Sequence, residues 1–256
     1  SQRASSLIDL FMQLRMLSLH NERLSEIAFS EPEKDMPTRR IFDKDEGVKL
    51  EVKNLSYQYD PFSQPIFSNL NIIIEQGESV ALIGPSGIGK TTLLKVMCGL
   101  LSPSAGDVLV DNLNISKIGL NNYRLSTACV LQEDRLFSGS ILENISGFED
   151  NVDEEFVIEC ARHSNIHDEI MKMPMGYETL IGELGSGISG GQKQRLLIAR
   201  ALYRKPCILF MDEATSHLDL NNEASINNAI SKLSITRIIV AHRPSTIASA
   251  DRVIDL

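Results

Sequence analysis

The chain has 256 residues, 43% of them apolar, which suffices to bury the core of one large domain or of one domain with appendages. Its formal net charge of −9 argues against nucleic acid as the main partner, because binding to a phosphate backbone needs a basic face. No apolar run approaches the roughly 18 residues of a membrane span. The four cysteines are scattered through apolar stretches, which indicates reduced core thiols of a cytosolic protein.

The first 47 residues differ in pattern from the rest of the chain. Apolar residues spaced by three, four and seven predict an amphipathic helix within residues 1–28. Residues 29–47 contain two prolines and mixed charges, as a linker does. Apolar and polar residues alternate over 48–53, so we expect a strand there and a folded domain over residues 48–256.

A glycine-rich motif of the form G-x-x-x-x-G-K-[ST] spans Gly84–Thr91. A strand pattern at 79–83 precedes it and a helix pattern follows from Lys90, a context that favours a phosphate-binding loop over a plain glycine turn. Backbone N–H groups and the helix N-terminus would hold phosphate oxygens, with Lys90 on the β- and γ-phosphates and the Thr91 hydroxyl on Mg²⁺. The predicted nucleotide-binding residues here are Gly84, Pro85, Ser86, Gly87, Ile88, Gly89, Lys90, Thr91 and Thr92.

A second glycine motif lies about a hundred residues further along. Ser189, Gly190, Gly191 and Gln192 open a predicted helix that runs through Ala201. A hydroxyl, free backbone N–H groups and a helix N-terminus suit a γ-phosphate, so these four residues are also predicted to bind nucleotide. The alternative is an ordinary loop and helix cap.

Two acidic residues and one histidine follow predicted strands. The apolar run 208–211 delivers Asp212 and Glu213 at its carboxyl end, where open α/β sheets place their ligands. Because neighbouring side chains of a strand point to opposite faces, Asp212 is predicted to hold Mg²⁺ and Glu213 to act as general base on water. A strand at 237–241 ends at His242, a position that taken alone is more often structural than catalytic.

Together, the two glycine motifs and the acidic pair resemble the nucleotide-binding domain of ABC transporters. The resemblance implies an α/β fold with a P-loop NTPase (RecA-like) core, an antiparallel β-subdomain and an α-helical subdomain at about residues 133–203 that carries the second motif. It implies ATP and Mg²⁺ as ligands, with GTP left open. It also implies a homodimer, in which Ser189–Gln192 of one chain meets the nucleotide on the phosphate loop of the other.

The resemblance further implies roles for single residues. Tyr59 matches the aromatic residue that stacks on adenine, although a plain strand aromatic is the alternative. Gln132 matches the glutamine that ligates Mg²⁺ or orients water, and His242 matches the switch histidine that positions the water, so Glu213, His242 and Gln132 are the expected catalytic residues. The expected dimer-interface residues are Ser216, His217 and Asp219, with His217 in place of the usual alanine.

Residues 14–24 and 173–183 are most similar to the peptidase-containing colicin V and bacteriocin exporters within this family. This implies part of a longer polypeptide at the cytoplasmic face of the bacterial inner membrane, with a covalently linked transmembrane domain, an upstream peptidase domain, accessory export proteins and no nucleic acid. The helix of residues 1–28 would then extend a membrane helix, and an ordinary helix packed on its own domain is the alternative.

Other functions stay open on the sequence. The cargo of the exporter is a peptide in the favoured interpretation, and a lipid, a drug or another protein in the alternative one. A soluble ABC ATPase without a transport role and a nucleotide-gated binding module without turnover are further alternatives. Intact Glu213 and His242 disfavour the binding module, because nucleotide binding alone needs neither.

Overall fold

The computed structural model describes residues 2–29, 41–42, 46–60, 62–182, 187–213 and 220–256, in two compact units, 1–37 and 38–256. The first unit contains the helix α1 (Gln2–Ala28). Phe11 and Leu14 project from one side of α1, and Met12 and Met16 project from the opposite side. All four side chains are exposed. The predicted helix is therefore present, but it lacks the single apolar stripe of an amphipathic helix. None of the described helices has the length and hydropathy of a membrane span.

An antiparallel sheet opens the second unit, in the order β2-β1-β4-β5. Along β1, Leu50, Val52 and Leu55 are buried and Lys53 is exposed, as a sheet with one covered face requires. The alternation predicted from residue 48 is thus confirmed. The strands are β1 (Leu50–Tyr57), β2 (Phe67–Ile74), β4 (Ala105–Val110) and β5 (Leu113–Asn114).

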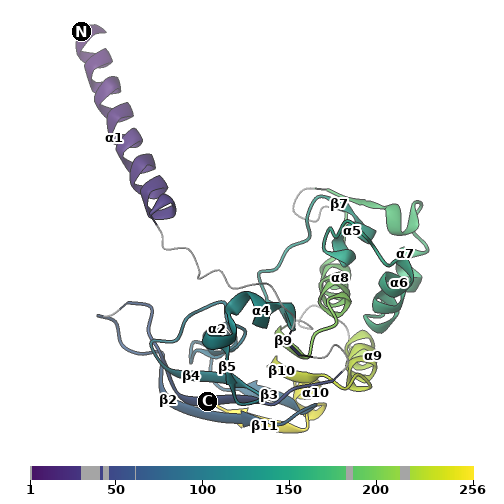
Figure 1. The fold of residues 1–256 in the computed structure, drawn as a ribbon. Coiled ribbons are helices and arrows are strands. Elements are labelled where there is room, and N and C mark those ends of the chain that lie inside the picture. Colours follow the sequence, from purple (N-terminus) through teal and green to yellow (C-terminus); the bar gives the residue numbers. More distant parts are fainter. Residues whose placement is uncertain (1, 30–40, 43–45, 61, 183–186, 214–219) are drawn as a thin grey trace. The chain divides into compact units, whose positions relative to one another are not determined.

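A five-stranded parallel sheet, β11-β3-β10-β9-β6, forms the centre of the unit (Figure 1). Its inner strands β3 (Ser79–Ile83), β10 (Thr236–Val240) and β9 (Ile208–Asp212) are almost continuously buried, because both faces of the sheet are covered. The edges are β11 (Arg252–Asp255) and β6 (Thr127–Val130). The helices of the unit outside the arm described below are α2 (Lys90–Met97), α3 (Ile115–Ile118), α4 (Leu120–Leu125), α9 (Leu220–Ser231) and α10 (Pro244–Ala248), of which α3 lies beside β4 and β5. This is the predicted α/β core.

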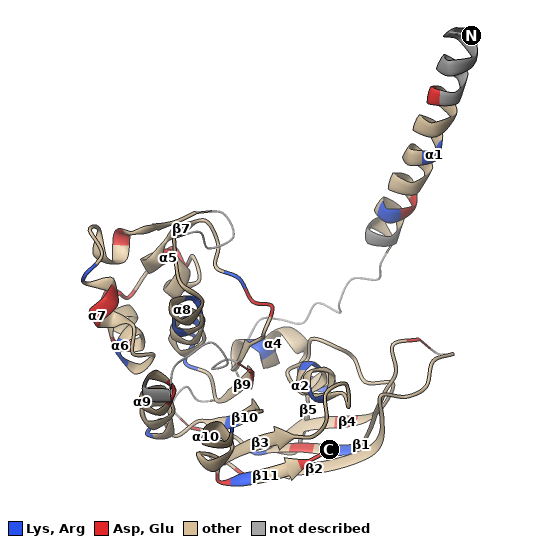
Figure 2. Ribbon diagram, turned by 180° about the vertical axis from the view of Figure 1, so that it is seen from behind, with Lys and Arg blue, Asp and Glu red and all other residues tan. Residues whose placement is uncertain are grey.

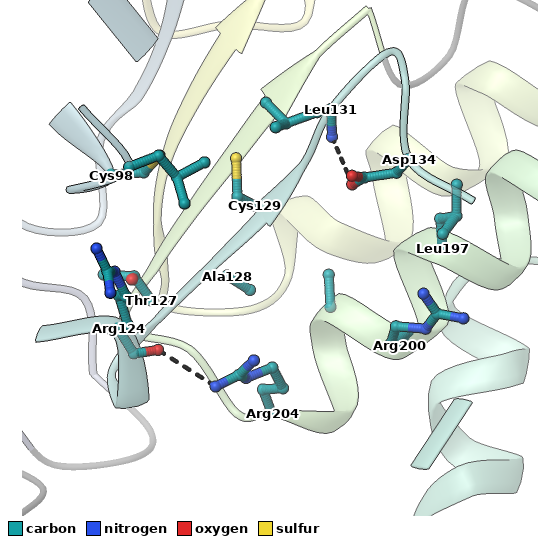
Figure 3. A pocket seen from close by; sticks show the side chains of 12 residues that line it. Cys98, Arg124, Thr127, Ala128, Cys129, Leu131, Asp134, Leu197, Arg200 and Arg204 are labelled. Atoms are coloured by element: carbon teal, nitrogen blue, oxygen red, sulfur yellow. Dashed lines mark hydrogen bonds between the residues drawn. The ribbon is translucent and has the colours of Figure 1, made fainter. Parts of the chain in front are cut away.

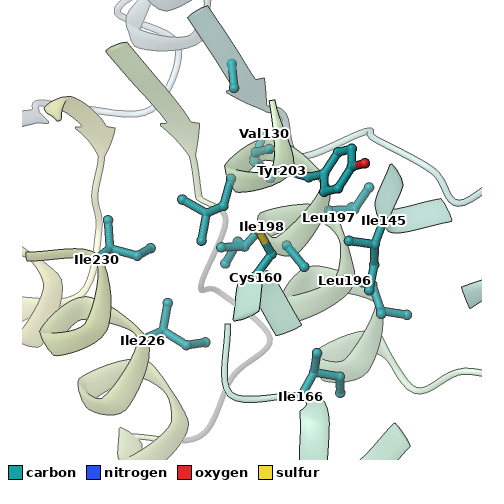
Figure 4. Packing of buried hydrophobic residues seen from close by; sticks show 14 of the residues in the cluster. Val130, Ile145, Cys160, Ile166, Leu196, Leu197, Ile198, Tyr203, Ile226 and Ile230 are labelled. Atoms are coloured by element: carbon teal, nitrogen blue, oxygen red, sulfur yellow. The ribbon is translucent and has the colours of Figure 1, made fainter. Parts of the chain in front are cut away.

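Between β6 and β9 the chain forms a mainly helical arm. Apolar residues of α8 pack with those of α5, α6 and β6 in one buried cluster that includes Ile145, Cys160, Leu196 and Ile198 (Figure 4). A short antiparallel pair, β7 with β8, was not predicted from the sequence. The elements are β7 (Gly139–Ser140), α5 (Ile141–Ser146), α6 (Glu154–His163), α7 (His167–Ile170), the 3₁₀ helix η1 (Gly176–Glu178), β8 (Leu180–Ile181) and α8 (Gly190–Tyr203).

One buried hydroxyl fastens the beginning of the second unit to the parallel sheet. Thr236, the first residue of β10, donates from Oγ1 to the Val48 carbonyl at 2.7 Å and accepts from the Gly77 N–H at 3.0 Å. The Val48 N–H also lies 3.1 Å from this hydroxyl. A Cβ at Gly47 would stand 2.7 Å from the Gly77 nitrogen, so glycine is required there. The amino end of β10 is thus fixed to residues 47–48, and its other end leads to His242.

Acidic and basic positions are scattered over the described elements of the chain (Figure 2). The Arg252 guanidinium on β11 lies 2.6 Å from the Glu78 carboxylate just before β3, an ion pair that joins the edge strand to its neighbour. Exposed pairs of this kind contribute about 0–1 kcal/mol each, so the fold rests mainly on its apolar clusters.

Candidate functional site

A pocket of about 350 Å³ opens at the carboxyl ends of β9 and β10, beside the start of α2. Four distant stretches of sequence meet there: the predicted aromatic segment, the phosphate loop, the acidic pair and the histidine. Open parallel sheets bind ligands at this end of their strands. The lining residues are Tyr59, Ile66, Ser86, Gly87, Gly89, Lys90, Thr91, Thr92, Glu213, Val240 and His242.

The phosphate loop takes a shape that only glycine adopts without strain at three positions. The φ angles of Gly84, Gly87 and Gly89 are 141°, 83° and 105°. At Gly89 packing is a second constraint, because an added Cβ would lie 2.4 Å from Cγ2 of Ile66. The motif therefore encodes both the turn and a close approach of the loop to the segment before β2.

Lys90 is 6% exposed and its ammonium group points back into the loop. Nζ donates to the carbonyl of Gly84 at 2.8 Å and to the carbonyl of Pro85 at 2.9 Å. Buried ammonium groups require such partners. Lys90 is thus held inside the loop, at the first residue of α2, where a phosphate group would add a stronger, charged acceptor.

Asp212, the last residue of β9, is 1% exposed, and neither carboxylate oxygen has a hydrogen-bond partner among the described residues. Burial raises the pKa of Asp212 and the Glu213 charge adds to this, whereas the neighbouring Thr91 hydroxyl opposes it. Two unsatisfied buried carboxylate oxygens beside a threonine hydroxyl are a donor set that suits a hard cation. Asp212 and Thr91 therefore fit a Mg²⁺ ion.

Glu213 turns away from the strand that carries Asp212. Its φ of +50° is left-handed, a costly conformation that clusters at functional sites. Its N–H donates to the Val240 carbonyl at 3.3 Å, and its carboxylate Oε1 lies 3.1 Å from Nε2 of His242. Because β9 ends at Asp212 and Glu213 has a left-handed backbone, the alternation of strand side chains expected from the sequence does not set the direction of the Glu213 side chain.

Tyr59 offers a free aromatic face at the mouth of the pocket. The residue is 65% exposed, and its hydroxyl lies 3.1 Å from the hydroxyl of Thr92 on α2. The Tyr57 ring, 5.1 Å away and perpendicular, supports it from the core side. An exposed ring beside a phosphate loop suits stacking on a base.

Gln132 is exposed in a turn after β6 and does not line the 350 Å³ pocket. Asp134 closes this turn, since one of its carboxylate oxygens accepts from the Leu131 N–H at 2.8 Å. The structure thus does not bring Gln132 together with Thr91 and Asp212, and its role in metal binding stays a prediction.

The second glycine motif forms the start of α8. Ser189 Oγ accepts from the Gln192 N–H at 3.2 Å, and Gln192 Oε1 accepts from the Ser189 N–H at 2.9 Å, which together form a capping box. Ser189 and Gly190 are exposed, and the pocket lining does not include residues 189–192. Within one chain the two motifs therefore do not share a pocket.

Glu169 on α7 fixes the second motif, and sequence reasoning missed it. Its carboxylate accepts from Gln192 Nε2 at 2.9 Å and lies 2.7 Å from Nη1 of the buried Arg195. Burial opposes the charge of Glu169, but the Arg195 and Gln192 hydrogen bonds outweigh it and lower the pKa of this carboxyl. No spacing rule joins residues 23 apart on two different helices, so the sequence held no local signal for this contact.

The predicted interface residues Ser216, His217 and Asp219 lie outside the described residues.

A second pocket, of about 290 Å³, lies between the edge strand β6 and the helix α8 (Figure 3). Three arginines, Arg124, Arg200 and Arg204, line it together with apolar side chains, and Asp134 stands at the turn that contains Gln132. The Arg204 guanidinium donates to the Arg124 carbonyl at 3.4 Å. The pocket is basic and partly apolar, and it adjoins the segment after β6.

Comparison with known proteins gives a consistent result. A family model described as ABC transporter matches residues 67–216. Over all 256 residues the chain is 57% identical to the probable microcin-H47 secretion/processing ATP-binding protein MchF and to the colicin V secretion/processing ATP-binding protein CvaB, both of Escherichia coli. The chain spans 37% of the length of each.

A solved structure is similar in fold and sequence. It is described as a bacterial Atm1-family ABC exporter with ATP bound, and it superposes on 96% of this chain and 43% of that one with a TM-score of 0.83 and 31% identity.

Proposed function

Because this chain belongs to the ABC transporter family, we propose that it is the ATP-hydrolysing domain of an exporter that secretes a peptide of the microcin or colicin V class. The observation that carries this proposal is the 57% identity over the whole chain to two peptide-secretion proteins. Since the chain spans 37% of their length, transport would require parts that lie outside it.

The arrangement of the pocket supports a general-base mechanism of hydrolysis. Water attacks the γ-phosphorus while Glu213 accepts its proton, and ADP leaves as the bond to the γ-phosphoryl group breaks. His242, 3.1 Å from Glu213, would hold the water and a γ-phosphate oxygen in line. Lys90 would bind the β- and γ-phosphates from its place inside the loop. Tyr59 would stack on the purine, and stacking does not separate ATP from GTP.

Thr91 and Asp212 would hold a Mg²⁺ ion that neutralises phosphate charge, with Gln132 as a further ligand once its turn reaches the pocket. The free carboxylate oxygens of Asp212 support this assignment.

The second motif supports a homodimer with two nucleotides between the chains. Ser189 and Gly190 are exposed at the N-terminus of α8 and stand apart from the pocket of their own chain. They are therefore free to meet the γ-phosphate held by a partner chain. Ser216, His217 and Asp219 would contribute to the same interface.

The relatives support a location at the cytoplasmic face of the inner membrane, with a linked transmembrane domain, an upstream peptidase domain and accessory export proteins. Both are described as secretion/processing proteins, which fits a peptidase beside the transporter. The basic pocket at Arg124, Arg200 and Arg204 suits an acidic, partly apolar segment of the membrane part (Figure 3).

A test replaces the ATP-binding part of the colicin V secretion protein with this chain and measures both colicin V secretion and MgATP hydrolysis. We expect both activities, and we expect Lys90→Met to abolish both while Glu75→Gln, on an exposed turn, retains them. Hydrolysis without secretion would contradict the peptide cargo and favour a lipid, a drug or a non-transport role. Nucleotide binding without hydrolysis would favour a binding module.

A further inference from the structure

Glu223 on α9 is a buried carboxylate that the proposed mechanism does not use. It is 1% exposed and does not line the 350 Å³ pocket. Its oxygens accept from Arg243 Nη1 at 3.0 Å, from Ser245 Oγ at 3.0 Å and, at a short distance, from Thr246 Oγ1. All three donors belong to segment 243–246, which comprises the N-cap and the first turn of α10.

Burying an ionised carboxylate costs free energy unless hydrogen-bond donors replace the water that it loses. Burial opposes the charge of Glu223, but the hydrogen bonds from Thr246, Arg243 and Ser245 outweigh it and lower the pKa of this carboxyl. Glu223 is therefore ionised at neutral pH. A single charged acceptor thus binds all three donors and fixes the position of segment 243–246.

His242 directly precedes segment 243–246. On its other side, the Ala241 N–H donates to the Leu82 carbonyl at 3.2 Å, which continues the pairing of β10 with β3. His242 thus lies between an anchor in the sheet and the anchor at Glu223. Its Nε2 stands 3.1 Å from Glu213 Oε1, and its side chain is 44% exposed, so packing alone does not fix the ring.

We propose that Glu223 is a positioning residue: by binding Arg243, Ser245 and Thr246 together, it holds the backbone at His242 so that the imidazole meets Glu213. This inference rests on the proposed ATPase function. Glu223 does not line the 350 Å³ pocket and acts through His242. The sheet anchor at Ala241 would remain without it, but Arg243, Ser245 and Thr246 would lose their shared acceptor.

The first test measures ATP hydrolysis by Glu223→Gln, with Glu155→Gln on the exposed face of α6 as matched control. We expect kcat to fall by roughly tenfold or more, as for a misplaced catalytic group, with KM and the nucleotide dissociation constant changed less than about twofold. Ser245→Ala, which removes one of the three donors, should give a smaller loss of the same kind. An unchanged kcat in folded Glu223→Gln overturns the proposal.

The second test is a double-mutant cycle with His242→Ala. If Glu223 acts through His242, Glu223→Gln adds less than about a twofold loss in the His242→Ala background. Two losses that multiply would indicate an independent structural role and overturn the proposal.

A third measurement does not depend on hydrolysis. The measurement uses ¹H–¹⁵N spectra of the histidine side chains, in which the His242 signals are those that disappear in His242→Gln. Glu223→Gln should shift these signals in the same direction as Glu213→Gln does. Unshifted signals overturn the proposal. A wild-type chain that hydrolyses no ATP contradicts the proposed function instead, and the spectra then still decide whether Glu223 positions His242.

Discussion

Oε1 of Glu213 lies 3.1 Å from Nε2 of His242, although 29 positions separate the two residues in the chain. The register of the parallel sheet sets this contact, because Val240 of β10 pairs with Asp212 of β9. Each strand therefore delivers its next residues to the same edge. The proposed general base and the histidine therefore meet in the same pocket.

Glu213→Gln should reduce ATP hydrolysis by about 10²–10⁴-fold, because the neutral amide cannot accept the proton of the attacking water. Nucleotide binding should persist, and a nucleotide-bound dimer should accumulate. Phosphate release and sedimentation with MgATP measure the two effects. Wild-type turnover in the variant would contradict the assigned role, and Glu75→Gln serves as an exposed control.

Ser189→Arg should abolish ATP-dependent dimerisation while the monomer keeps its nucleotide affinity, since Ser189 does not line the pocket of its own chain. Loss of the helix cap should cost about 1 kcal/mol of stability. Sedimentation of the double variant with Glu213→Gln measures dimerisation. Ser116→Arg at an exposed position of α3 is the control. A large loss of affinity in the monomer would argue against action across the dimer.

Glu169→Gln should destabilise the fold by about 1 kcal/mol at neutral pH, a modest figure because the carboxylate is 37% exposed and solvent screens part of its interaction with Arg195. The folded pKa of Glu169 is lowered, so its stabilisation is present above the unfolded value of about 4.3 and is lost as the pH falls through the folded value. Urea midpoints of both proteins between pH 3 and 7 should therefore converge only on the acidic side. A gap that widens toward acid would contradict this assignment.

Gly89→Ala should destabilise the protein more than Gly77→Ala. Both positions have positive φ, 105° and 73°, and the backbone strain costs about 1 kcal/mol in each. Only at Gly89 would the new Cβ also meet Ile66, at 2.4 Å, whereas Gly77 has open space. Thermal unfolding and ATP binding measure the difference. Equal losses in both variants would indicate that packing at Gly89 does not matter.

Tyr59→Ala should weaken ATP and GTP binding alike by about 1–3 kcal/mol, the range for loss of one stacked base. Tyr59→Phe keeps the ring and should lose little, although it breaks the contact with Thr92. Fluorescence titration with both nucleotides measures this, and the unfolding temperature should stay unchanged because Tyr59 is 65% exposed. Unfolding of Tyr59→Ala would indicate that Tyr59 serves the fold instead of nucleotide binding, although it lies beyond the end of β1.

Much of the pocket could be predicted from the sequence because its chemistry is local. The run Gly84–Thr91 contains a turn, a lysine and a helix start within eight residues. The end of each buried strand also indicates where the polar residue that follows it lies. Strand ends therefore located Asp212 and His242 without knowledge of the register.

Contacts between distant elements could not be predicted in this way. Glu169 binds residues at the start of α8, and Glu223 binds Arg243 and the first turn of α10. No periodicity marks either acid as the partner of these residues. The exposed turn of Gln132 likewise follows a strand, but the strand end alone does not decide whether the turn reaches the pocket. The amphipathic pattern predicted for α1 rested on the apolar residues that fit one helix face. It left out Met12 and Met16, which lie on the other side.

The hydroxyl of Thr236 connects two distant parts of the domain through one strand. At its first residue, β10 is hydrogen-bonded to residues 48 and 77, and at its other end Ala241 and His242 follow Val240. The segment 47–48 and the pocket are therefore held by the same five-residue strand, which spans about 16 Å.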